Sequence, residues 1–188
     1  MRGGGNVQTL PRMNAAAQQV VAALGLAPLP REGGFFRVTW RTAAGSAIYF
    51  LLTDDAEGFS ALHRLRTDEL WHFHAGDAIE QVQLDPRTGA AKRLVLGTDL
   101  AAGQHPQVVA PAGVWQGSRL WHAGASATGE GGRAGTHTPA AAQPHGWALV
   151  SCTLAPPWDE VECEFGERAA LERQFPEHAD LVRALTRR

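Results

Sequence analysis

The chain has 188 residues, of which 44% are hydrophobic and 19% charged, and its formal net charge is -2. This length suits a single domain with a core of useful size. Because the sequence has neither a basic stripe nor a block of like charges, nucleic acid and anionic membranes are not expected as partners. It also has no apolar run near the roughly 18 residues of a membrane span and no segment typical of a signal peptide, so we expect a cytoplasmic protein.

The first part of the chain predicts a tail followed by one helix. Residues 1–13 have the composition of a flexible tail, and residues 14–188 are expected to form one domain. Asn14 is a good N-cap for a helix over Ala15–Leu24, an alanine-rich segment with an apolar face. Gly25 is a stop signal, and the prolines that follow prevent the helix from resuming.

From Phe35 onward the pattern changes to short β-rich runs separated by turn residues. The predicted strands cover residues 35–41, 46–53, 62–65, 69–75, 79–84, 92–96, 107–110, 114–118, 147–154 and 161–165. Many short strands at a spacing of roughly ten residues favour a sandwich or barrel over an α/β fold. The chain is then expected to close with two helices, over residues 167–175 and 179–187.

Two features interrupt or punctuate this β-rich region. Residues 122–146 are mostly Gly, Ala, Thr and Pro, which cannot bury enough apolar surface to become ordered, so we expect a flexible loop. The two cysteines, Cys152 and Cys163, are too few for a disulfide framework. We expect them to be buried, reduced thiols.

The spacing of polar residues between positions 58 and 76 carries most of the functional signal. His63 is followed by Glu69 after a turn, and Leu65 faces the same way as His63 because residues two apart in a strand share a face. A second polar position, Gln116, follows the turn that contains Pro111 and Gly113.

On these residues the chain resembles the cupin superfamily, and within it a subgroup of uncharacterised single-domain cupins of about this length. The resemblance also covers residues 32–37, 47–52, 63–72, 107–117, 152–153 and 156–159. It implies a mainly β fold, in which a double-stranded β-helix (jelly-roll) barrel is flanked by N- and C-terminal helices. It also implies a pocket inside the barrel and, in most members, a dimer.

The resemblance places the metal-binding positions of the superfamily at His63, Leu65, Glu69 and Gln116. A catalytic divalent metal generally needs three protein ligands, often histidines with a carboxylate. Leucine cannot bind a metal, and an amide oxygen is a weak ligand for zinc, iron or nickel. We therefore expect no metal cofactor. His63, Glu69 and Gln116 remain weak candidate ligands, and a divalent metal remains an alternative.

The same positions also suit chemistry without a metal. A carboxylate such as Glu69 within hydrogen-bond reach of His63 fixes the imidazole tautomer and favours its protonated form, as in a general base. Tyr49, on a central strand, is the candidate acid on the opposite side. The resemblance supports this arrangement, because the sugar-nucleotide epimerase branch of the cupins is understood to use a His/Tyr pair. In the alternative interpretation, His63 and Glu69 merely satisfy each other as a buried pair.

Further residues are candidates for contact with a ligand. The candidate ligand-binding residues are Trp71, Gln107, Trp115 and Gln116. Strand alternation places Trp71 on the same face as Glu69, and His72 and His74 on the opposite face. Trp71 and Trp115 are either part of the core or flat walls against which a ring-shaped ligand stacks.

Three functions remain open from the sequence. The first is a cupin that binds a small polar, in some cases ring-containing, molecule and acts as a metal-free isomerase, epimerase or lyase. The second is a metal-dependent dioxygenase or isomerase with a reduced ligand set, and the third is a non-catalytic storage or sensor protein. We also expect a homodimer, because residues 35–40 predict an apolar edge strand that a second subunit can pair with.

Overall fold

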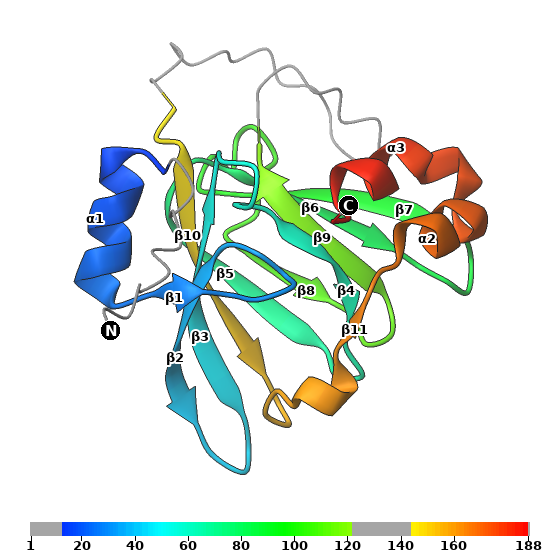
Figure 1. The fold of residues 1–188 in the computed structure, drawn as a ribbon, viewed down its shortest axis with the longest axis horizontal. Coiled ribbons are helices and arrows are strands. Elements are labelled where there is room, and N and C mark those ends of the chain that lie inside the picture. The colour runs from blue at the N-terminus through cyan, green and yellow to red at the C-terminus, as the bar shows by residue number, and fades with distance from the viewer. Residues whose placement is uncertain (1–12, 122–143, 188) are drawn as a thin grey trace, which may run out of the picture.

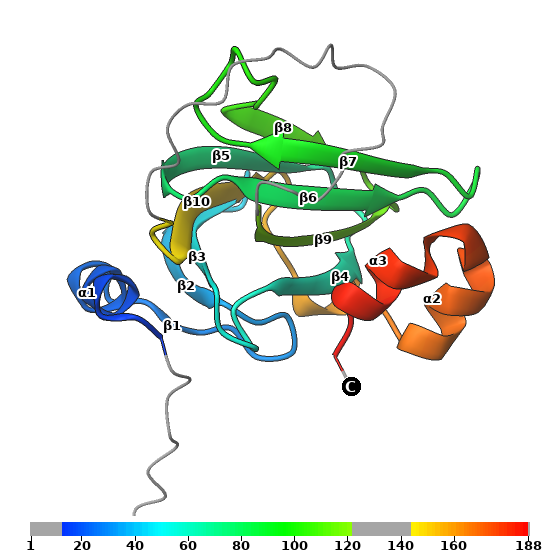
Figure 2. The ribbon, with the colours of Figure 1, turned by 90° about the horizontal axis from the view of Figure 1, so that it is seen from above.

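The computed structural model describes residues 13–121 and 144–187. Residues 1–12 of the predicted tail over residues 1–13, and residues 122–143 of the predicted loop over residues 122–146, lie outside the described residues. The last residue of the predicted tail, Met13, is described and is buried in the cluster beneath α1. Within the described residues the strands form two antiparallel sheets (Figure 1). Figure 2 shows these sheets facing each other, with the interior of a barrel between them. The predicted mainly β, jelly-roll architecture is confirmed.

Each sheet combines strands from distant parts of the sequence. In spatial order, the first sheet contains β1 (Ala27–Pro28), β2 (Phe35–Arg41), β3 (Ser46–Thr53), β10 (Trp147–Leu154), β5 (Glu69–Gly76) and β8 (Gln107–Ala110). The second contains β11 (Glu164–Phe165), β4 (Ser60–Arg64), β9 (Trp115–Leu120), β6 (Ile79–Leu84) and β7 (Ala91–Leu96). The crossing of the chain between the sheets places β4 and β5, which are consecutive in sequence, on opposite walls of the barrel.

A helix covers the outer face of the first sheet (Figure 2). This helix, α1 (Ala15–Leu24), begins as predicted at Asn14, whose side chain accepts a hydrogen bond from the backbone N–H of Ala17 at 2.8 Å. It ends at Gly25, which adopts the left-handed conformation with φ 60°. The apolar side of α1 packs on outward-facing residues of β2 and β3, including Phe35 and Leu51.

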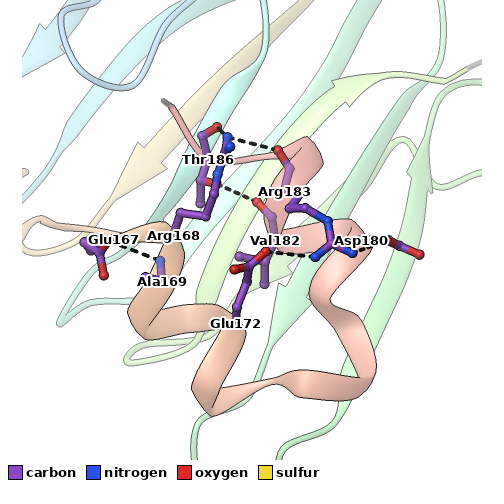
Figure 3. A network of polar contacts seen from close by, with 8 residues as sticks. All are labelled: Glu167, Arg168, Ala169, Glu172, Asp180, Val182, Arg183 and Thr186. Atoms are coloured by element: carbon purple, nitrogen blue, oxygen red, sulfur yellow. Dashed lines mark hydrogen bonds and ion pairs between the residues drawn. The ribbon is translucent and has the colours of Figure 1, made fainter.

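Two C-terminal helices, α2 (Arg168–Gln174) and α3 (Ala179–Ala184), cover the outer face of the second sheet, with the 3-10 turn Pro176–His178 between them. Figure 3 shows the polar contacts that join them. The Arg168 side chain donates to the hydroxyl of Thr186 at 2.8 Å and to its carbonyl at 2.6 Å, and Arg183 pairs with Glu172 at 2.9 Å. Both helices are shorter than predicted.

The structure adds a strand that the sequence did not predict. β1 pairs with β2 only at Phe35 and Phe36, so the remainder of β2 has one unpaired edge among the described residues. Two large apolar side chains there, Val38 and Trp40, are 49% and 46% exposed. The edge that the dimer prediction requires is present, and dimerisation itself stays a prediction. No helix in the described part of the chain is long and apolar enough to cross a membrane.

Candidate functional site

A cavity of about 330 Å³ opens at one end of the barrel. Its walls come from β2, β3, β5 and β10 of the first sheet, from β4 and β11 of the second sheet, and from the segments around residues 29–32 and 158–163. The other end of the interior is filled by apolar side chains, including Trp71, Ile79 and Leu120. Two of the predicted catalytic residues, His63 and Glu69, line the cavity. The volume is at the small end of the range for ligand sites.

His63 is the candidate base, and its backbone contact fixes the imidazole tautomer. Its side chain is 2% exposed, and Nδ1 lies 2.9 Å from the carbonyl oxygen of Ala61. Because a carbonyl only accepts, Nδ1 carries the proton in this contact, and Nε2 of the neutral ring is left with its lone pair. Burial alone would lower the pKa of His63, but the carboxylates of Glu32 and Glu69 and the Ala61 carbonyl outweigh it, so the pKa is raised.

Glu69, at the start of β5, is held by two neighbours. Its Oε2 accepts from Nε1 of Trp71 at 3.0 Å and from Nε2 of Gln116 at 2.7 Å. Trp71 Nε1 also donates to Oε1 of Gln116 at 3.1 Å, so the three side chains form a closed network. Burial raises the pKa of Glu69, as does Glu32, against the opposing effects of His63, Gln116 and Trp71.

The structure corrects one feature of the predicted pair. No hydrogen bond or ion pair joins His63 to Glu69, although both residues are described; each has its own partners on its own side of the barrel. The expectation of a carboxylate within hydrogen-bond reach of the imidazole is therefore wrong. The two groups influence each other through their charges, and both line the same cavity.

Glu32 is a further acidic residue of the site, which the sequence analysis did not select. It lines the cavity, and its Oε1 accepts a hydrogen bond from the hydroxyl of Ser60 at 2.7 Å. Two glycines follow it with φ of 100° and 66°. A side chain at the first, Gly33, would lie 2.5 Å from the carbonyl of Phe59, so the chain needs glycine to turn here. The two glycines after Glu32 were the feature of the sequence that could have indicated a turn holding this carboxylate at the site.

Three predicted site residues lie elsewhere. Tyr49 packs on the outer face of the first sheet, against the apolar cluster that α1 forms with Phe35 and Leu51. Its ring lies edge-on to that of His74, with the two ring centroids 6.1 Å apart. Trp115 packs beneath α2 and α3 on the outer face of the second sheet. Gln107 is exposed on β8. The expectations that Tyr49 faces His63 and that Trp115 and Gln107 contact a ligand in the barrel are wrong, because these side chains point out of it.

Two other predicted residues, Trp71 and Gln116, contact Glu69 but do not line the cavity. Trp71 is 1% exposed and belongs to the interior core, so it is not a wall of the cavity. Gln116 is 2% exposed and also lies behind Glu69 rather than at the cavity surface. Both residues position the Glu69 carboxylate. Strand alternation was predicted correctly for His74, which lies on the outer face with Tyr49.

The residues present do not fit a tightly held divalent metal. Leu65 lines the cavity at the position where a second histidine ligand would be needed. The amide of Gln116 uses its nitrogen on Glu69 and its oxygen on Trp71. Within residues 13–121 and 144–187, no group of three or more His, Cys, Asp or Glu side chains is arranged to hold a metal ion.

Two thiols and one tryptophan also line the cavity, together with the polar side chains of Arg31, Arg41, Ser46 and Glu160. Cys152 and Cys163 line it as free thiols. Burial raises the pKa of Cys152 well above the usual range and that of Cys163 to about 12, so neither is a thiolate near neutral pH. Trp158, another residue that the sequence analysis did not select, lines the cavity while 41% exposed, and its backbone N–H donates to the hydroxyl of Ser46 at 2.9 Å.

Comparisons with known proteins agree with this architecture. A family model described as Cupin superfamily (DUF985) matches residues 18–166. A crystal structure of a protein from Shewanella oneidensis is 30% identical, covering 91% of this chain and 97% of that one, with a TM-score of 0.73. A hypothetical protein from Leishmania major is 27% identical, covering 92% of this chain and 99% of that one, also with a TM-score of 0.73.

More distant structures show the fold alone. Oxalate decarboxylase from Bacillus subtilis is 9% identical, covers 85% of this chain and 37% of its own, and has a TM-score of 0.50. At this identity the likeness extends to the barrel and not to the chemistry. The search of curated proteins found no match.

Proposed function

The chain belongs to the cupin superfamily, in the family described as DUF985, and from this premise we propose that it binds a small polar molecule in its barrel and acts on it by metal-free acid–base chemistry. In this proposal His63 is the base. Glu69 is the second proton-transfer group, on the opposite wall of the cavity. The reaction class is an isomerisation, an epimerisation or an elimination, each of which begins with removal of a proton from carbon.

The observation that carries the proposal is the environment of His63. Its Nδ1–H is held by the Ala61 carbonyl, its Nε2 makes no hydrogen bond with any described residue, and the ring lines the cavity. A base needs such an accessible lone pair at a fixed position. The carboxylates of Glu32 and Glu69 favour the imidazolium that forms when Nε2 accepts a proton, because both raise the pKa of His63.

The separation of His63 from Glu69 supports the same chemistry. The two residues come from β4 and β5, on opposite walls, with no direct bond between them. Both hydrogen bonds that Glu69 accepts from described residues fall on Oε2, which leaves Oε1 for a ligand. When Oε1 of Glu69 carries a proton, a form that its raised pKa favours, His63 can remove a proton from one side of the ligand while Glu69 donates its proton from the other. The step leaves His63 as the imidazolium and Glu69 as the carboxylate, as suits an epimerase or isomerase.

Exchange of carbon-bound hydrogen for deuterium tests the proposal without requiring a complete turnover. The protein is incubated in D₂O with small carbonyl compounds, namely pyruvate, levulinate, cyclohexanone and glyceraldehyde, and exchange is followed by proton NMR. We expect exchange of at least one probe above the buffer rate and a loss of about 10²-fold or more in His63→Gln. His74→Gln, on the outer face of the sheet, is the matched control and should retain the wild-type rate. Equal exchange in His63→Gln would contradict the assignment of the base.

A non-catalytic cupin is the second candidate, and one observation favours it. The Glu69, Trp71 and Gln116 side chains satisfy one another in a closed, buried network, as they would in a barrel with a purely structural interior. A probe that binds in the cavity, as detected by a shift of the His63 resonances, but never exchanges its hydrogen would support this candidate over the enzyme.

We also propose that the chain forms a homodimer through β2. The support is the unpaired part of this edge strand, with Val38 and Trp40 about half exposed. Light scattering should give twice the chain mass, and Trp40→Lys should shift the protein to the monomer. A monomeric wild type at micromolar concentration would contradict the proposal.

A further inference from the structure

A second groove adjoins the cavity and extends it along the surface. The groove has a volume of about 560 Å³, and three arginines line it: Arg31, Arg64 and Arg66. The groove and the cavity share the lining residues Arg31, Leu65, Cys163 and Phe165. Arg31 is therefore accessible from the cavity as well as from the groove.

Arg31 differs from its neighbour Arg64 because its charge is not used within the protein. Arg64 donates from Nε to Oε2 of Glu164 at 2.7 Å. The side chain of Arg31 makes no hydrogen bond or ion pair with any residue the structure describes. Its guanidinium instead lies over the ring of Phe165, with Cζ 4.1 Å from the ring centroid. This stacking leaves the N–H groups at the edge of the guanidinium plane available to an acceptor.

The backbone at Arg31 is in an unusual conformation. Its φ of 68° makes it the only non-glycine residue with a positive φ in the described part of the chain. A left-handed conformation is strained at a residue that carries a side chain. Such strain is found preferentially at functional sites. Here it directs the Arg31 side chain onto Phe165 at the junction of cavity and groove.

Arg31 lies close enough to His63, the candidate base, for one small molecule to contact both side chains. Phe165 contacts both groups, since its centroid lies 4.1 Å from Arg31 Cζ and 6.1 Å from the centroid of the His63 ring. Arg31 Cζ is thus no more than about 10 Å from the His63 ring. A group bound by Arg31 can belong to the same small molecule that His63 contacts.

The remaining cavity wall is largely apolar. Its apolar side chains include Leu29, Phe36, Ile48, Phe50, Leu154 and Trp158. Two of its acidic residues, Glu32 and Glu69, interact electrostatically with His63, and Glu160 is a third acidic residue of the lining. A molecule that suits these walls has an apolar body and an acceptor group at the end that lies near Arg31.

We propose that the ligand is a small carboxylic acid with an apolar or aromatic body, whose carboxylate is bound by Arg31 while its body enters the cavity toward His63. This inference rests on the proposed function and names its substrate class. A planar carboxylate matches the two parallel donors of one guanidinium. A phosphate dianion fits less well, because Glu160 of the cavity and Glu162 of the groove add negative charge nearby.

Matched acids and amides test this assignment. Phenylacetate is compared with phenylacetamide, and hexanoate with hexanamide, by calorimetric titration of the full chain, with inorganic phosphate as a further probe. We expect each acid to bind about tenfold or more tightly than its amide, as is typical of a charge-assisted hydrogen bond. Arg31→Asn should remove this difference, since asparagine tolerates the left-handed backbone. Arg37→Asn is the matched control, because Arg37 also lies over an aromatic ring, Tyr49, but outside the cavity.

The outcomes separate this inference from the proposed function. Amides that bind as tightly as acids, while still shifting the His63 NMR resonances, would overturn the inference and leave the function standing. A preference for acids that survives in Arg31→Asn would also overturn it, and so would phosphate binding more tightly than either acid. If no probe of either class binds or shifts His63, both proposals fail.

Discussion

The two faces of the second sheet carry opposite kinds of side chain. Where α2 and α3 cover three of its strands, the residues that point outward are apolar, whereas their immediate neighbours point into the barrel and are polar. The outward residues include Leu62, Val82, Leu84 and Trp115, and the inward residues are His63, Gln81, Gln83 and Gln116. Both sets are buried, so burial alone does not distinguish core from site.

This difference indicates that the outer face mainly stabilises the fold, whereas the inner face mainly provides the groups for binding and chemistry. Beneath α2 and α3 the outer face buries its apolar surface against helices, which is the main source of folding free energy. The buried Glu80, on the same face of β6, is paired with Arg93 and Arg119. The inner face keeps titratable groups in a cavity, where each needs a hydrogen-bond partner to offset the cost of burial. We therefore expect changes on the outer face to affect mainly stability and changes on the inner face to affect mainly binding and chemistry.

The largest expected effect on stability is on the outer face. Leu62 is 1% exposed and packs against the C-terminal helices. Leu62→Ala should lower the free energy of unfolding by about 2–5 kcal/mol, measured by urea denaturation, because it removes buried methyl groups and leaves a cavity. Affinity of the folded protein for a cavity ligand should not change. Leu100→Ala, at a residue that is 67% exposed, should have almost no effect on either quantity. A large loss of affinity in folded Leu62→Ala would contradict the division between the faces.

A smaller stability effect is expected at Glu69 on the inner wall of the barrel. Glu69→Ala leaves the buried N–H groups of Trp71 and Gln116 without this acceptor, which should cost about 1–3 kcal/mol in thermal or urea unfolding. Glu69→Gln still offers an amide oxygen to these donors and should remain closer to the wild-type stability. It should nevertheless reduce deuterium exchange, because an amide does not transfer the proton. Equal stability of the Ala and Gln variants would show that the network contributes nothing.

The pH dependence of stability sharpens the comparison further. A group whose pKa is raised in the folded protein holds its proton more tightly there, so the free energy of unfolding falls as the pH rises from the unfolded to the folded pKa. For His63 this pH window starts at the ordinary histidine pKa of 6.5 and extends to higher pH. For Glu69 the window starts at the ordinary glutamate pKa of 4.5 and also extends to higher pH. His63→Gln should therefore remove a decline in stability above pH 6.5, measured by urea denaturation at a series of pH values.

His74 provides a control of opposite sign. Burial and the nearby His72 lower the pKa of His74, so its contribution to stability increases as the pH rises toward 6.5. His74→Gln should remove that increase and leave the decline above pH 6.5 in place. The same pH profile in both variants would mean that His63 is not the group responsible.

The smallest effect is expected at Arg31. Arg31→Gly relieves the cost of the left-handed backbone and loses the contact with the Phe165 ring, so the two changes nearly cancel and the stability should stay within about 1 kcal/mol of the wild type. Arg37→Gly, in the extended strand β2, brings no such relief and should cost more. A loss above about 2 kcal/mol in Arg31→Gly alone would show that this arginine has a structural role instead.

Local patterns in the sequence predicted much of the fold. Asn14 and Gly25 define both ends of α1, and most strands were predicted within a few residues, because turn chemistry and strand composition act over short distances. β1 was missed, since two residues with a proline carry no strand pattern and are ordered by pairing with Phe35 and Phe36. The spacing of His63 and Glu69 in the sequence predicted correctly that both side chains lie at the cavity.

The orientation of the remaining site residues depends on the tertiary structure. Alternation along a strand says which residues share a face, but not which face points into the barrel when both faces are covered. Tyr49 and Trp115 point outward because α1 and the C-terminal helices bury those faces. Glu32 and Trp158 come from loops whose positions depend on distant contacts, such as that of Glu32 with Ser60.

The central claim, a base held in one tautomer at the cavity, is tested most directly by NMR of ¹⁵N-labelled histidine in the full chain. The His63 signals are assigned by their absence in His63→Gln and followed through a pH titration. We predict that the neutral ring carries its proton on Nδ1, as the Ala61 contact requires, and that the titration midpoint lies above 6.5. A neutral ring protonated on Nε2, or a midpoint at or below 6.5, would contradict the account of this site.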